Sequence, residues 1–157
     1  MQQNHRYFLF SILLLHCVTN CGETAMRMFK QETLYRDKMV EFLEQKCGSR
    51  IHWCLLGDAD FDREIRSKLL SETEEVVAAK DRNTLIGELA DVYEVIDALT
   101  ALHNISKEEI IASQTKKRDE RGGFMGRKFV TVAEHPVGSF GEKYCLADPE
   151  KYPEIIK

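Results

Sequence analysis

The longest amphipathic stretch of the chain covers residues 68–102, and four polar residues interrupt it once, at positions 80–83. On either side of the interruption, apolar residues recur with the three- and four-residue spacing of one α-helical face. A short polar break between two such segments is typical of an antiparallel helical hairpin. We expect the two helices to pack through one apolar stripe, formed by Leu69, Val76, Leu89, Val92, Ile96 and Leu99.

The ends of these two helices carry cap signals. Asp60 is a suitable N-cap for a helix over residues 61–79, because its carboxylate accepts hydrogen bonds from the first free N–H groups. Asn83 or Thr84 would cap the second helix of the hairpin in the same way. That helix is expected to end near residues 103–104.

Two more helices flank the hairpin. The apolar pattern after residue 34 predicts a helix that Gly48 ends, since glycine readily adopts the left-handed conformation of a helix stop. Ser106 and Glu109 form a capping box, which predicts a further helix up to about residue 121. Four predicted helices make the chain an all-α protein, in the form of a four-helix bundle.

The pattern changes after residue 126. Residues 128–132 alternate and are rich in β-branched and aromatic types, which predicts a short strand. Residues 143–146 would pair with it across the glycines at 138–141. The C-terminus is therefore expected to be a short β-hairpin or an extended tail.

An apolar run at residues 7–18 follows a short, weakly basic N-terminus. It is too short to span a bilayer but has the length of a signal-peptide core. One interpretation is export or lipid anchoring through residues 7–21, although Asn20 makes a poor lipid-attachment motif before Cys21. The other, which we favour, is that translation starts later, at Met26 or Met28.

These observations divide the chain into three parts: an N-terminal extension at residues 1–27, a helical domain at 28–133 and a tail at 134–157. The net charge of −4 and the pI of about 5.8 give no reason to expect a nucleic-acid polymer or an anionic membrane as partner. Five cysteines without a CxxC motif indicate neither a disulfide framework nor a zinc site. Free thiols favour the cytoplasm.

Two pairs of carboxylates mark the hairpin. Glu72 and Glu75 are three residues apart, as are Glu88 and Asp91, so each pair lies on one helical face. The pairs are placed symmetrically about the interruption, and folding the hairpin brings them level. Four like charges repel unless a cation sits among them, and oxygen-only ligands favour Mg²⁺ or Mn²⁺. The alternative is that these carboxylates form ordinary solvated helix faces.

Basic residues form two groups outside the hairpin. Arg36 and Lys38 are candidate phosphate contacts, or else surface charges at the start of a helix. Residues 116–121 are rich in lysine and arginine, which compensates the dipole at a helix C-terminus. A separate cluster of bases is also what polyphosphate hydrolysis requires beside an acidic metal site.

The motif ExxE, twelve residues, ExxD at Glu72 to Asp91 resembles that of the all-α nucleoside triphosphate pyrophosphohydrolase superfamily. This is the MazG-like group, which includes phosphoribosyl-ATP pyrophosphohydrolase. Residues 34–39 (LYRDKM) and 117–124 (a K-x-x-x-R-G-G-F run) are similar to segments of its predicted house-cleaning subgroup. The resemblance covers residues 29–132, and residues 1–27 have no counterpart in it. Val40 replaces a proline that is usual in that subgroup.

The resemblance implies a hydrolase that cleaves a non-standard nucleoside triphosphate between its α and β phosphates, releasing a monophosphate and pyrophosphate. Mg²⁺, with Mn²⁺ as the alternative, would be held by Glu72, Glu75, Glu88 and Asp91. Glu72 or Glu75 would act as the base, and Lys117 and Arg121 as phosphate clamps. A homodimer or higher homo-oligomer is expected.

Two alternative functions stay open at this point. Residues 75–81 also resemble phosphoribosyl-ATP pyrophosphohydrolase of histidine biosynthesis. A non-catalytic helical interaction module would use the same hairpin for assembly only.

Overall fold

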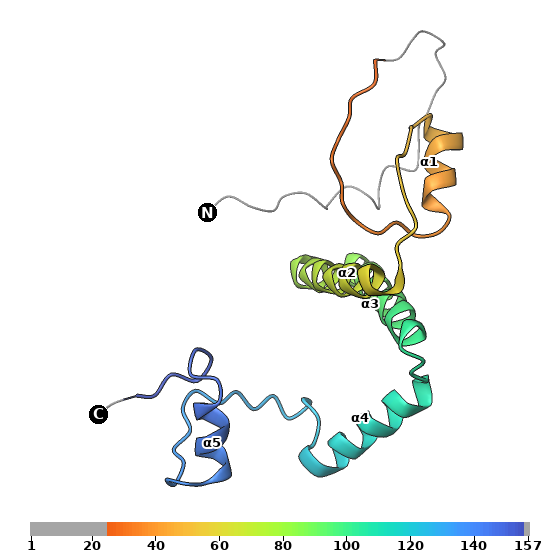
Figure 1. Cartoon of the computed structure of the whole chain (residues 1–157). Helices are drawn as coiled ribbons and strands as arrows, with labels where there is room; N and C mark the ends of the chain where they lie inside the picture. Colours follow the sequence, from red (N-terminus) through yellow and green to blue (C-terminus); the bar gives the residue numbers. More distant parts are fainter. Residues whose placement is uncertain (1–24, 156–157) are drawn as a thin grey trace. The chain divides into compact units, whose positions relative to one another are not determined.

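A computed structural model of the chain describes residues 25–155, and this part contains five helices and no strand (Figure 1). The all-α class is therefore confirmed. The helices are α1 (Met39–Cys47), α2 (Asp58–Ala78), α3 (Arg82–Leu102), α4 (Lys107–Arg121) and α5 (Phe140–Leu146).

The chain divides into two compact units, Met1–Ile111 and Ala112–Lys157. The first holds α1, α2, α3 and the start of α4. Within its described residues, α2 and α3 are the only helices that pack against each other, and Figure 1 draws them side by side. The predicted four-helix bundle is thus not confirmed; the predicted hairpin is.

The predicted apolar run at residues 7–18 lies outside the described residues. Among residues 25–155, no helix is both long and apolar enough to cross a membrane. Residues 25–36 form an irregular segment, and a turn at positions 37–38 leads into α1. Gly48 ends that helix as predicted, with φ at 65°.

The turn of the hairpin is held by Asp81, where the sequence predicted Asn83 or Thr84 as the cap. Asp81 Oδ1 accepts hydrogen bonds from the backbone N–H groups of Asn83 at 2.8 Å and Thr84 at 2.9 Å. Its Oδ2 accepts a third from the Thr84 hydroxyl at 2.8 Å. The prediction was wrong by two or three residues because these positions already belong to the first turn of α3.

The start of α2 also differs from the prediction. Its N-cap is Gly57, and Asp58 and Asp60 lie in its first turn, where negative charge favours a helix N-terminus. An ionic cluster joins this end of the hairpin to the end of α3: Asp62 Oδ1 lies 2.6 Å from His103 Nε2. The hydrogen bond from Arg66 and then the one with His103 lower the pKa of Asp62.

The core between α2 and α3 is small. Ile65 and Val95 are its buried apolar residues, and neither belongs to the predicted stripe. Members of that stripe are half-buried, except Leu89, which is 40% exposed. Two helices alone cannot enclose a full stripe on each other, so only residues along the line of contact are buried.

The capping box of Ser106 and Glu109 is confirmed. The Glu109 carboxylate accepts a hydrogen bond from the Ser106 N–H at 2.8 Å, and the Ser106 hydroxyl accepts one from the Glu109 N–H at 3.2 Å. Hydrogen bonds donated to the carboxylate by the Ser106 N–H and then by the Ser106 hydroxyl lower the pKa of Glu109. The helix that follows, α4, starts at Lys107.

The predicted C-terminal β-hairpin is wrong. Residues 128–132 form no strand, and residues 143–146, expected as its second strand, lie in α5. Ser139 caps that helix by accepting the Glu142 N–H at 3.3 Å, and Glu142 accepts the N–H of Gly138. This local cap forms from neighbouring residues, whereas the strand pair would have required a separate partner segment.

Replacing Asp81 with alanine should destabilise the hairpin, because two N–H groups and a hydroxyl lose their acceptor. We expect the melting temperature to fall by a few degrees, on the order of 5 °C, by circular dichroism. Lys80→Ala, at the exposed neighbouring position, is the matched control. Equal melting temperatures for the two variants would show that the cap does not stabilise the hairpin.

Candidate functional site

Three carboxylates from both helices of the hairpin meet at one point. Glu72 and Glu75 from α2 and Glu88 from α3 each offer an oxygen within 4.8 Å of the others. Glu72 is only 4% exposed, and it is the one buried charged residue of the described part of the chain. We call these three residues the carboxylate cluster. Three of the four predicted metal ligands are thus brought together.

The negative charge of the cluster is only partly compensated, since its three carboxyl groups have one ammonium group, that of Lys68, beside them. Burial raises the pKa of Glu75 to about 7, and the nearby charges of Glu72 and Glu88 and a hydrogen bond with Glu88 add to the shift. Burial, followed by the charge of Asp91, raises the pKa of Glu88. Near neutral pH, a proton on Glu75 therefore offsets part of the negative charge of the cluster. Glu75 donates this proton in a hydrogen bond to Glu88.

Lys68 is a further member of the site that the sequence analysis did not single out. It forms an ion pair with Glu72, one helical turn further along α2. Its charge also acts on Glu75 and Glu88, where it opposes the rise in pKa. The signal was present in the sequence, since a lysine and a glutamate four residues apart share a helical face.

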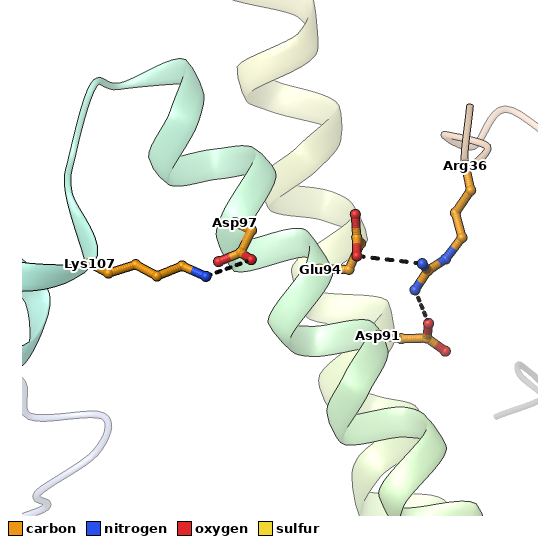
Figure 2. Close-up of polar contacts among 5 residues, drawn as sticks. All are labelled: Arg36, Asp91, Glu94, Asp97 and Lys107. Carbon is orange, nitrogen blue, oxygen red and sulfur yellow. Dashed lines mark hydrogen bonds and ion pairs between the residues drawn. The ribbon is translucent and has the colours of Figure 1, made fainter. Parts of the chain in front are cut away.

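Asp91, the fourth predicted ligand, lies outside the carboxylate cluster. Figure 2 shows it paired with Arg36, whose other terminal nitrogen lies 3.6 Å from Glu94 Oε2. Arg36 comes from the irregular segment before α1, so this contact ties the segment to α3. A residue predicted to bind phosphate here neutralises a residue predicted to bind metal.

The other predicted phosphate contacts are exposed side chains. Lys38 is exposed at the N-cap position of α1. Lys117 and Arg121 are exposed on α4, one turn apart, and belong to the second unit. Further along α3, Asp97 pairs at 3.0 Å with Lys107, which fixes the start of α4 to the end of the hairpin (Figure 2).

The donor set of the carboxylate cluster fits a hard divalent cation. Only carboxylate oxygens converge there, which suits Mg²⁺ or Mn²⁺ and not zinc, whose sites usually recruit cysteine or histidine. A divalent cation would also offset the burial and the like-charge repulsion that raise the pKa values of Glu75 and Glu88.

No family model, no curated protein and no solved structure matches this chain. The chemistry of the site therefore follows from its own residues: a buried carboxylate with an internal counter-ion, and two half-buried carboxylates that share a proton.

The raised pKa of Glu75 makes stability depend on pH. The folded state holds this proton up to about pH 7, whereas an unfolded glutamate has an ordinary pKa of 4.5 and releases its proton there, so stability falls as pH rises across this window. With EDTA present, the urea midpoint should fall from pH 5 to pH 7.5. The fall should be smaller in Glu75→Gln than in Glu74→Gln, the exposed control. An equal fall in both would contradict the assignment to Glu75.

Proposed function

We propose that this protein is a Mg²⁺-dependent nucleotide pyrophosphohydrolase, which cleaves a nucleoside triphosphate between its α and β phosphates. The observation that supports this proposal most directly is the convergence of Glu72, Glu75 and Glu88 within 4.8 Å at the contact of α2 and α3. The spacing that produces this convergence is the same spacing on which the resemblance to MazG-like enzymes rests.

Glu72, Glu75 and Glu88 would hold the cation, and Asp91 would join them if Arg36 releases it. Bound there, Mg²⁺ supplies polarisation of the phosphate oxygens and a lower pKa for a coordinated water. Mn²⁺ offers the same chemistry. Glu72 already pairs with Lys68, so the main role of Glu72 would be to bind the cation.

Glu75 is the better candidate for the general base. Its pKa is about 7 without a cation, and a bound cation would lower that value, so the base would be a Glu75 oxygen that the cation does not engage. It would accept the proton of the attacking water. Lys117 and Arg121 would neutralise the phosphate chain, in the role that the resemblance assigns to them.

A second copy of the chain is part of this proposal. The hairpin leaves large apolar side chains in water, such as Val77 at 86% exposed and Tyr93 at 69%. Leu70, Ile86 and Leu89 are exposed as well. Apolar surface on this scale usually marks an interface, and a homodimer of hairpins would supply the four-helix bundle that one chain lacks.

Pyrophosphate release tests the proposal. The wild type should release pyrophosphate from at least one member of a panel of standard and damaged nucleoside triphosphates and phosphoribosyl-ATP, only with Mg²⁺ present. Glu88→Gln should lower the rate by about a hundredfold or more, because the cluster loses one charged ligand. Glu74 is an exposed neighbour on α2, and Glu74→Gln should release pyrophosphate at the wild-type rate.

The preferred substrate separates house-cleaning from histidine biosynthesis. No release from any substrate, together with no binding of Mg²⁺ by folded protein, would leave the non-catalytic helical module as the better interpretation.

Arg36 should compete with the cation for Asp91. Arg36→Ala should therefore bind Mn²⁺ about two- to fivefold more tightly than wild type, as expected for loss of an exposed ion pair. Asp91→Asn should bind it more weakly. Titration by calorimetry checks both, with Arg63→Ala as control, since Arg63 pairs only with Asp60 and Glu64 on its own helix. Weaker binding by Arg36→Ala would rule out the competition.

A further inference from the structure

Lys68 faces two parts of the first unit at once. On one side its ammonium group pairs with Glu72, and its charge acts on the rest of the carboxylate cluster. On the other side it lines a cavity of about 100 Å³ between α2 and the segment at residues 31–34. Its side chain is 30% exposed and lines this cavity while its ammonium group is paired with Glu72.

The cavity offers hydrogen-bonding groups around that ammonium. Thr33, Ser67 and Ser71 line it together with Lys68. Two carboxylates also belong to its lining, but each has its own cation: Glu32 pairs with Lys30 at 2.8 Å, and Glu64 pairs with Arg63 at 3.0 Å. Lys68 is therefore the positively charged residue of this lining, and the carboxylate cluster alone balances its charge.

The charge balance changes once the cluster holds a divalent cation. With Glu75 ionised, three carboxylates and one ammonium group carry a net charge of −2. A divalent cation at the same place brings this sum to zero and competes with the ammonium group for Glu72, so that the ammonium group can pair with a nearby anion. A phosphate chain bound to the cation at the cluster is such an anion, and ammonium groups commonly bind phosphate as point charges.

We infer that Lys68 binds a phosphate oxygen of the nucleotide substrate, at the edge of the carboxylate cluster that opens to this cavity. This inference rests on the proposed function. It assigns to the first unit a phosphate-binding cation of its own, in addition to Lys117 and Arg121 of the second unit.

Two binding measurements test the assignment, because they respond in opposite directions. The first is the affinity for Mn²⁺ alone, and the second is the affinity for inorganic tripolyphosphate with saturating Mg²⁺, both by calorimetry at pH 8. Tripolyphosphate carries all three phosphate positions without a base, so the result does not depend on nucleoside specificity. The variants are Lys68→Met, Lys68→Gln and Lys68→Arg, with Lys80→Met as the exposed control.

The Met and Gln variants should bind tripolyphosphate about tenfold or more weakly, as expected for loss of a charge-assisted hydrogen bond. They should bind Mn²⁺ at least as tightly as wild type, because a competing positive charge has gone. Lys68→Arg should retain most of the tripolyphosphate affinity, and Lys80→Met should change neither value. Circular dichroism establishes which variants are folded, and Lys68→Gln replaces Lys68→Met if the latter is not.

If the folded Met or Gln variant binds tripolyphosphate as tightly as the wild type, the inference is overturned and the proposed function still stands. Parallel losses of Mn²⁺ and tripolyphosphate affinity would also overturn it, because Lys68 would then act only by supporting Glu72. If the wild type binds neither Mg²⁺ nor tripolyphosphate, the proposed function fails together with the inference.

Discussion

The burial of Glu72 between α2 and α3 is the constraint on which the site depends. An ionised carboxylate loses several kcal/mol of hydration when it leaves water, and an internal cation must offset that loss. Lys68 does so from one turn away on the same helix. The helix contact then brings two more carboxylates to Glu72, and their repulsion is relieved in part by a proton held on Glu75.

The position of this cluster along the hairpin is set at both ends. Asp81 fixes where α3 begins, and the Asp62–His103 contact fixes which residue of α2 lies opposite the end of α3. A shift of one residue moves a helix by about 1.5 Å and turns its side chains by about 100°. Such a shift would separate Glu88 from the α2 carboxylates, so the polar contacts at the ends control the geometry in the middle.

Basic side chains of the chain already pair with carboxylates that a metal ion would have to bind. Lys68 engages Glu72 and Arg36 engages Asp91, so two of the four predicted ligands carry a counter-ion from the chain itself. Binding of a divalent cation would free both positive side chains next to the place where phosphate groups would bind. These contacts supplement a small core, since only Ile65 and Val95 are buried apolar residues in the part of the chain that the structure describes.

The sequence by itself determined the features that depend on near neighbours. Helical periodicity and the polar break predicted the hairpin. The mirror-related spacing predicted that four carboxylates converge, and Glu72, Glu75 and Glu88 do so. The tertiary structure alone decided that Asp91 pairs with Arg36, fifty-five residues away in the chain. It also decided how deeply Glu72 is buried and that Glu75 is half-buried, and burial raises the pKa of Glu75. Periodicity fixes which residues share a face of one helix, but contacts between distant segments and their exposure to water depend on the path of the whole chain.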